Sequence, residues 1–373
     1  MPENHYKLFI INPGSTSTKF SLFENHHEVF NMDIFHDSSE LRRFPTINDQ
    51  LDWRIQVMDK NLKEHGISLT GVDAIVGRGG GCYAIPGGIY RIDERLIRDT
   101  REARGGLYHA SMLGVQMASI YGARYGGMLL MMDPPVVDEL QPMARITGVR
   151  GIYRRAISHA LNLKAVARRH AAVMGRRYED CRFIVCHIDG GISVTAHELG
   201  RMIDGNDAGG GQGPFTPTRM GSMAVTDVLS QLWDHDPAEV RTLCSQGGGL
   251  SSWFGTSDST KLHRRMEEGD KVVRAVWDAM IYQIIKSIGA MSTVLHGRAD
   301  AIVLTGGLLR FPEIQARIDS DCGWIAPVYA YPGEMEQQAM ADGAMRVLEG
   351  EEEILTYPGK SVWDGLEGIS AMQ

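Results

Sequence analysis

The sequence predicts an α/β protein made of two related halves. Residues 8–23 read as a strand, a tight turn and a second strand, because Pro and Gly at 13–14 interrupt two apolar runs. The same plan returns at residues 183–196, around a turn that contains Gly190 and Gly191. A third glycine turn follows a strand at 305–307. One glycine-turn hairpin repeated half a chain apart suggests two halves that face each other across a cleft.

The remaining chain reads as alternating strands and helices. Further strands are predicted at residues 29–35, 74–76, 128–132, 301–304 and 325–329, and helices at 51–62, 109–121, 159–174, 262–297 and 337–348. Ser158 is the predicted cap of the helix 159–174. The segment 262–297 is apolar around most of its circumference, and Arg274, Asp278 and Lys286 interrupt it. It is therefore expected to be a core helix and not a membrane span.

Composition limits the classes of partner. The chain has 373 residues, enough for two domains, with 43% hydrophobic and 23% charged residues and a net charge of −8. An acidic chain without a basic tail is not expected to bind nucleic acid through a broad positive face. An anionic substrate would need a local cluster of Arg, Lys and His side chains.

The five cysteines form no Cys-x-x-Cys pair, which is typical of buried thiols in a reducing compartment. The N-terminal residues lead directly into a short apolar strand, so no signal peptide is expected. A cytoplasmic location follows as an expectation.

Several strand ends carry polar residues suited to an anionic ligand. The Gly-, Ser- and Thr-rich turn after residue 12 offers backbone N–H groups and hydroxyls, the lining of a phosphate site, although an ordinary hairpin turn remains open. Arg78 lies in a glycine-rich loop after the strand 74–76, and Arg219 follows another at 209–213. Asp133 stands where the strand 128–132 stops, a favoured position for ligand contacts and also for a simple cap.

The common catalytic signatures are absent. The sequence contains no G-x-x-x-x-G-K-[ST] loop, no H-E-x-x-H metal motif and no G-x-S-x-G nucleophile motif. Phosphate recognition, if present, must use another kind of loop.

The order of these turns resembles the actin-like ATPase superfamily, and the wording of the motifs resembles the acetate and butyrate kinase family. N-P-G-S-T-S-T-K-F at 12–20 looks like that family's first signature. The motifs closer to butyrate kinase than to acetate kinase are V-G-R-G-G-G at 76–81, I-P-G-G at 85–88, H-A-S at 109–111, V-V-D-E-L at 136–140, H-A-L-N at 159–162, H-I-D-G-G-I-S-V at 187–194, G-P-F-T-P at 213–217, L-T-G-G at 304–307 and A-P-V-Y-A-Y-P-G-E at 326–334.

The resemblance implies a fold of two actin-like, RNase H-like domains of duplicated topology with a nucleotide cleft between them. The expected domains are 1–135 with about 338–373, and 136–337. It also implies ATP-dependent, reversible phosphorylation of a short-chain carboxylate, butyrate first, to its acyl phosphate. Isobutyrate, propionate or acetate is the alternative acid, and a silent nucleotide-binding sensor is the alternative class. A homodimer or higher homo-oligomer is expected.

Residue roles are carried over from the same resemblance. The implied catalytic residues are Asn12, Arg78, Asp133, His159 and Arg219. The implied contacts to ATP or ADP are Gly14, Ser15, Thr16, Lys19, His187, Asp189, Gly190, Gly191, Gly306 and Gly307. The Mg²⁺ ligands are expected to be Asp133 and Glu336, with Glu334 competing for the second place.

Three positions depart from the family pattern. Asp189 stands where butyrate kinases usually have Gly, and we hypothesise that it adds a metal contact. Ser158 replaces a usual Phe and Met112 a usual Asn, at positions near the family's acyl site. A smaller residue at 158 predicts a larger pocket, and hence a longer or branched acid.

Overall fold

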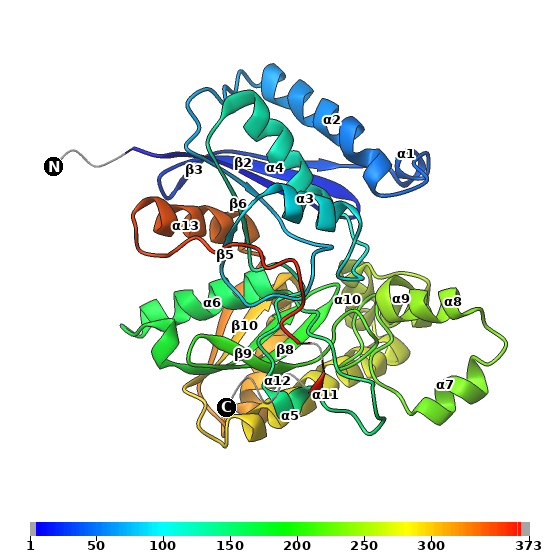
Figure 1. Cartoon of the computed structure of the whole chain (residues 1–373). Coiled ribbons are helices and arrows are strands. Elements are labelled where there is room, and N and C mark those ends of the chain that lie inside the picture. Colours follow the sequence, from blue (N-terminus) through cyan, green and yellow to red (C-terminus); the bar gives the residue numbers. More distant parts are fainter. Residues whose placement is uncertain (1–4, 364, 367–373) are drawn as a thin grey trace. The chain divides into compact units, whose positions relative to one another are not determined.

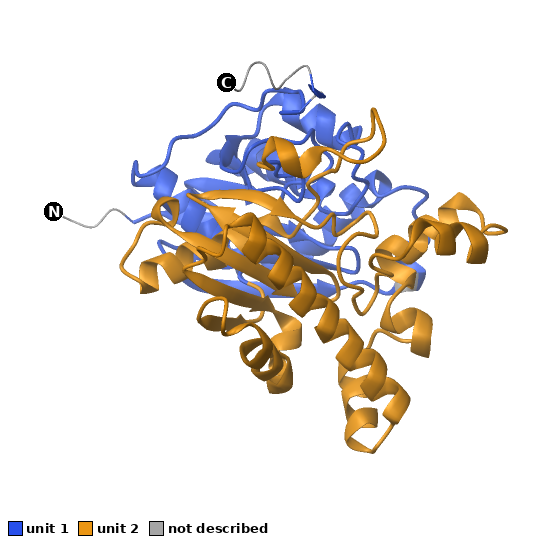
Figure 2. Ribbon diagram, turned by 90° about the horizontal axis from the view of Figure 1, so that it is seen from below, with its two compact units in different colours: residues 1–138, 335–373 blue, residues 139–334 orange. Residues whose placement is uncertain are grey.

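The protein is represented by a computed structural model, which describes residues 5–363 and 365–366. Its chain divides into two compact units, which are residues 1–138 with 335–373 (unit 1) and residues 139–334 (unit 2), as Figure 2 shows. Unit 1 is therefore discontinuous in sequence, whereas unit 2 is a single stretch. The narrower boundaries expected from the sequence remain predictions.

Unit 1 is built on a six-stranded sheet in the order β3-β2-β1-β4-β6-β5 (Figure 1). The strands are β1 Lys7–Pro13, β2 Ser17–Glu24, β3 His27–Phe35, β4 Ala74–Gly77, β5 Ile89–Arg91 and β6 Met128–Met132. The helices are α1 Ser38–Leu41, α2 Leu51–Glu64, α3 Glu94–Arg101, α4 Met112–Tyr125 and α13 Glu336–Leu348, and a 3₁₀ turn spans Asn48–Gln50.

The central strand β1 is covered on both faces. Phe9 and Ile11 point into a core that α2 and α4 complete. The alternate residues of the sheet face α13: Gln337 Nε2 donates to Ser21 Oγ at 2.8 Å. A strand buried on both faces reads as the continuous apolar run that the sequence shows.

Unit 2 is built on a five-stranded sheet in the order β11-β10-β7-β8-β9. The strands are β7 Arg182–Ile188, β8 Ile192–Glu198, β9 Arg201–Gly205, β10 Ala301–Gly306 and β11 Val328–Pro332. The helices are α5 Pro142–Arg145, α6 Ala160–Val173, α7 Val225–Gln231, α8 Pro237–Thr242, α9 Leu250–Phe254, α10 Ser259–Glu267, α11 Lys271–Val294 and α12 Pro312–Cys322. Short 3₁₀ turns span Tyr178–Asp180 and Gly307–Arg310, and a π-helical turn spans Leu243–Gly247.

The two faces of this second sheet differ in chemistry. Ile184, Cys186 and Ile188 of β7 pack into an apolar core with α11 and α12. The opposite face, under α6, carries buried polar side chains that include His187 and Thr305. The predicted phosphate contact His187 therefore lies on the polar face.

The two sheets repeat one topology. In unit 1, β1 pairs antiparallel with β2 and parallel with β4, and in unit 2, β7 pairs antiparallel with β8 and parallel with β10. Each antiparallel pair continues to a third strand, and each parallel pair continues to a parallel neighbour. The predicted α/β class with duplicated topology is confirmed.

The predicted helix at 262–297 is wrong in one respect, because two helices occupy it. α10 ends at Glu267 and α11 begins at Lys271. Gly269 between them has a φ of +94°, and the Asp270 carboxylate accepts from the N–H groups of Val272 and Val273. A left-handed glycine followed by an Asp N-cap ends one helix and starts the next. None of the described helices has the length and apolarity needed to cross a membrane.

The start of α6 also differs from the prediction. His159 and not Ser158 is the N-cap residue, and no side chain caps the helix. The side chain of His159 instead contacts the polar face of the unit 2 sheet, as described below.

A backbone-to-backbone contact joins β4 to α4. A Cβ atom at Gly77 would lie 2.2 Å from the carbonyl oxygen of Gly114, and one at Gly114 would lie 2.3 Å from the carbonyl oxygen of Arg78. Neither backbone can yield as a flexible side chain would. The absence of Cβ atoms therefore lets α4 approach the strand end that carries Arg78.

Replacing Gly114 with Ala should lower the free energy of unfolding by about 2–4 kcal/mol, because the new methyl overlaps backbone atoms. Gly289→Ala in α11 is the matched control, since nothing lies within 4 Å of a Cβ built there. There the better helix propensity of Ala should raise stability by about 0.5–1 kcal/mol. Urea unfolding measures both, and equal effects of the two substitutions would contradict the packing argument.

Candidate active site

In unit 1, three of the predicted catalytic and metal-site residues form one hydrogen-bonded cluster, which we call the unit 1 cluster: Asn12, Arg78 and Glu336. Asn12 near the end of β1 donates from Nδ2 to Glu336 Oε2 at 2.8 Å and accepts from Arg78 at 3.1 Å. Arg78 also forms an ion pair with Glu336. Since the Nε of Arg78 is buried without a partner, the guanidinium keeps one donor for a ligand.

The glycine turn beside this cluster is also held in place. Ser15 Oγ lies 3.0 Å from His109 Nε2. The backbone N–H of Ser111 donates to Nδ1 of the same ring, so Nε2 carries the proton and donates to Ser15. His109 belongs to the H-A-S motif at 109–111, to which the sequence assigns no role.

Asp133 lies at the end of β6 in a strained conformation. Its φ is +37°, unusual for a residue other than Gly, and its Oδ1 accepts from the N–H of Gly88 at 2.8 Å. The carboxylate is thus fixed to the I-P-G-G loop. Strain at such a position is often maintained for function. Lys19 lies 3.6 Å from Asp33, and its phosphate-binding role remains a prediction.

In unit 2, two stacked histidines form the centre of a second cluster, the unit 2 cluster: His159, Asn162, His187, Asp189, Ser193 and Glu334. The rings of His159 and His187 lie 4.0 Å apart and nearly parallel, at 18°. Ser193 Oγ lies 2.8 Å from Nδ1 of His159. The Asn162 amide lies 2.8 Å from Nδ1 of His187.

These contacts fix the role of the second ring. Because Asn162 donates its N–H to Nδ1 of His187, that nitrogen accepts and the proton resides on Nε2. Nε2 is then a hydrogen-bond donor, as a phosphate oxygen requires. The sequence does not single out Asn162 and Ser193, because both fall inside ordinary helix and strand patterns. For Asn162 the one signal is its position at the end of the H-A-L-N motif.

Asp189 ties two glycine turns together. Its Oδ1 accepts from Gly190 N at 2.8 Å and its Oδ2 from Gly307 N at 2.6 Å. The close approach depends on glycine at residue 307, because a Cβ there would lie 2.6 Å from the same oxygen. The neighbouring Gly306 has a φ of +109°, a backbone conformation that favours glycine. The predicted adenosine turn and the predicted phosphate turn are therefore neighbours.

Arg219 packs flat against the same turn. A Cβ on Gly191 would lie 2.5 Å from its guanidinium, and its NH1 donates to the carbonyl of Ala208 at 2.7 Å. Burial lowers the pKa of Arg219 below its usual range, although the negative charge of the nearby Asp207 acts in the opposite direction. Its Nε is buried and unpartnered, as in Arg78.

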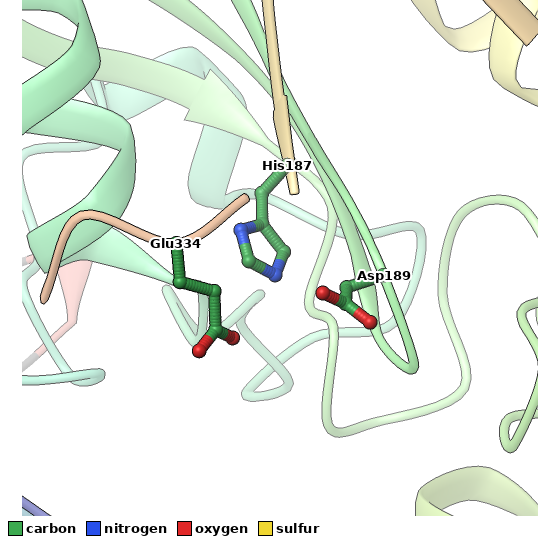
Figure 3. A group of neighbouring side chains, drawn as sticks. All are labelled: His187, Asp189 and Glu334. Atoms are coloured by element: carbon green, nitrogen blue, oxygen red, sulfur yellow. The ribbon is translucent and has the colours of Figure 1, made fainter. Parts of the chain in front are cut away.

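Three side chains of unit 2 could share a cation. Ligand atoms of His187, Asp189 and Glu334 lie within 4.8 Å of one another, with the two carboxylates on either side of the ring (Figure 3). Two carboxylates so close repel each other unless a positive charge lies between them. The carboxylate oxygens are the ligands that Mg²⁺ prefers. Of the three expected ligands this group includes Asp189; Asp133 and Glu336 lie in unit 1.

Most predicted residues thus lie in two groups, one in each unit. Asn12, Gly14, Ser15, Thr16, Arg78 and Glu336 belong to the first, and His159, His187, Asp189, Gly190, Gly191, Arg219, Gly306 and Gly307 to the second. The roles assigned to them remain predictions.

Known proteins resemble this chain over most of its length. The model of the Acetokinase family matches residues 145–311. A probable butyrate kinase of Enterococcus faecalis is 41% identical over 352 residues, covering 94% of this chain and 97% of that one. One from Clostridium botulinum is 41% identical over 354 residues, covering 94% and 99%.

Solved structures share the fold at low identity. Acetate kinase of Porphyromonas gingivalis superposes with a TM-score of 0.74 at 18% identity, over 92% of this chain and all of that one. A propionate kinase of Francisella tularensis gives 0.70 at 16%, over 91% and 98%. With full-length relatives at 41% identity, the resemblance drawn from the motifs is confirmed: the chain belongs to the acetate and butyrate kinase family, whose members are carboxylate-phosphorylating kinases.

Proposed function

We propose that this chain transfers the γ-phosphoryl group of ATP directly and reversibly to a short-chain carboxylate, with butyrate as the first candidate. The observation that carries the proposal is a pair of partly buried arginines, Arg78 and Arg219, each with a buried Nε that has no partner among the described residues. The chain fixes cationic donors where the family resemblance expects anions, and it supplies no nucleophile motif.

The chemistry of this reaction explains why the chain has cationic donors and no nucleophile motif. A carboxylate with a pKa of about 4–5 is already ionised at neutral pH and needs no general base. The obstacle is repulsion between two anions that must meet in line. Guanidinium forks suit carboxylate and phosphoryl oxygens, so Arg78 and Arg219 would reduce that repulsion.

The stacked histidines complete the donor set. Ser193 and Asn162 engage their Nδ1 atoms, and we propose that the Nε2 atoms bind phosphate oxygens. Fixed donors of this kind stabilise developing charge without reorganisation during the reaction. When bound, Mg²⁺ would neutralise phosphate oxygens. Asp189 and Glu334 fit it by their oxygens, and Asp133 and Glu336 remain the ligands that the family resemblance implies.

The acid is the open part of the proposal. Ser158 is half-buried and directly precedes His159, and its small side chain favours a branched or longer acid. Met112 is fully buried in the core of unit 1, so we base the size argument on Ser158 alone.

A panel of acetate, propionate, butyrate and isobutyrate tests function and specificity together, with acyl phosphate trapped as hydroxamate. Butyrate or isobutyrate should give a kcat/KM about tenfold above acetate, because each extra methylene gains apolar contact. Ser158→Phe should lower the ratio, and Ser158→Ala should leave it unchanged. A preference for acetate refutes the size argument, and the absence of any acyl phosphate would favour the silent sensor.

Removing one carboxylate tests the cation. Asp189→Gly should raise the Mg²⁺ concentration for half-maximal activity about tenfold, because one carboxylate of the proposed site is lost. Asp204→Asn is the control, since that carboxylate is paired with Arg154 at 2.9 Å. Magnesium titrations at saturating ATP measure both. An unchanged Mg²⁺ requirement in Asp189→Gly would falsify the metal contact.

We also propose that copies of the chain associate, as the family resemblance suggests. Unit 2 exposes apolar side chains on residues 143–153 and around α7, which we call the apolar face: Met143, Ile146, Val149, Ile152, Met223, Val225, Leu229 and Trp233. Both segments line one groove of about 610 Å³, through Thr147 and Val228. Clusters of exposed apolar residues are typical of association surfaces.

Val225→Lys combined with Leu229→Lys should shift the chain to the monomer, because charges would have to be buried at the contact. Light scattering after size exclusion gives the mass, which should fall at least twofold. Phe35→Lys, at an exposed apolar residue of unit 1, is the control and should keep the wild-type mass. An unchanged mass in the double variant would exclude the apolar face as the contact. The cytoplasmic location is likewise a proposal, consistent with five unpaired cysteines.

A further inference from the structure

Arg54 is a buried cation beneath the first glycine turn. It lies in the first turn of α2 and is 0% exposed. Its guanidinium donates to Ser17 O at 2.8 Å, to Thr18 Oγ1 at 2.9 Å and, more weakly, to Ser15 O at 3.4 Å. Two further bonds go to the side-chain oxygen of Gln50. Arg54 thus grips the turn from behind.

All of these acceptors are neutral. Within the described residues, Arg54 forms no ion pair with a carboxylate, and burial alone lowers its pKa to about 10, so it is charged at neutral pH. His36, which bonds to the same Thr18 hydroxyl, has its pKa lowered to about 4 by burial and by Arg54, and is neutral. A buried charge without a counter-ion is costly, and the helix dipole also disfavours a cation in a first turn.

The front of the turn has the opposite character. In a trans peptide the N–H points away from the preceding carbonyl, so holding Ser15 O behind directs the N–H of Thr16 forward. The backbone N–H groups of Ser15 and Thr16 have no partner among the described residues, and both residues are exposed. The turn therefore presents free donors on one side and a fixed positive charge on the other.

We propose that Arg54 is the built-in counter-charge of a phosphate site on this turn, completed when a phosphoryl group of ATP binds to the exposed N–H groups. The inference rests on the proposed function, because that function supplies the anion. Arg54 acts through the turn and does not touch the ligand, so it is a positioning residue. Its cost to the empty protein is offset on binding, since the anion restores local neutrality.

Calorimetric titration of the full chain with ATP, and separately with inorganic phosphate, tests this. Arg54→Met should raise both Kd values about tenfold or more, since one full charge is lost. Arg54→Lys keeps the charge without the fork and should raise them only about threefold. Arg145→Met is the control, because Arg145 is also buried, 2% exposed, but belongs to unit 2 and donates from Nε to the carbonyl of Leu140. It should lower stability and leave both Kd values unchanged.

A purely structural role predicts a different pattern. Arg54→Met would then lower the free energy of unfolding without ligand, with both Kd values within about twofold of wild type, and this result overturns the inference. If Arg54→Met does not fold, Arg54→Gln retains donors for Ser17 O without the charge and should show the same loss of affinity. Wild-type protein that binds neither ATP nor phosphate would overturn the proposed function as well, whereas normal wild-type binding with unaffected variants overturns this inference alone.

Discussion

Two central strands, β1 and β7, are buried on both faces, and the rest of the structure depends on this constraint. A side chain in the middle of such a strand meets only packed atoms, so polar groups are concentrated toward the strand ends. Asn12 stands near the end of β1, and Asp189 follows the end of β7. The carboxyl ends of central strands are where open α/β sheets bind ligands, and here each one runs into a glycine turn. Burial of the sheets thus decides where chemistry is possible.

Charge is managed locally and not through the net balance of the chain. A protein of net charge −8 binds anions, in our proposal, through partly buried guanidinium groups whose Nε atoms lack a partner among the described residues. Arg78 is balanced by Glu336, Arg219 lies close to Asp207, and Arg54 has neutral partners only. Because their carboxylate partners differ, we expect the three arginines to differ in how strongly each attracts an anion. His187, in the tautomer described above, adds a donor that carries no charge.

Sequence patterns predicted the duplicated hairpins, most strand positions and the residues that now group around the glycine turns. They succeeded because apolar runs and Gly or Pro turns are local signals. They missed Asn162, Ser193 and Arg54, since a polar residue in a helix or strand looks the same whether it faces solvent or a buried network. The join at Gly269 and Asp270 was hidden by apolar periodicity on both sides. Two glutamates two residues apart could not be separated either: Glu334 lies with Asp189, and Glu336 with Arg78, because the chain passes from one unit to the other between them.

The discontinuity of unit 1 has a consequence for biosynthesis. β1 is made first, but α13, which covers one face of its sheet, is made only after the whole of unit 2. Unit 2 is contiguous and can reach its native packing on the ribosome, as domains made in one stretch commonly do. Until α13 is made, one apolar face of the unit 1 sheet stays uncovered. This lasts for the time needed to translate about two hundred residues, at roughly 5–20 residues per second. The nascent chain therefore leaves one face of β1 uncovered for tens of seconds, which makes residues 7–13 a surface that chaperones would shield.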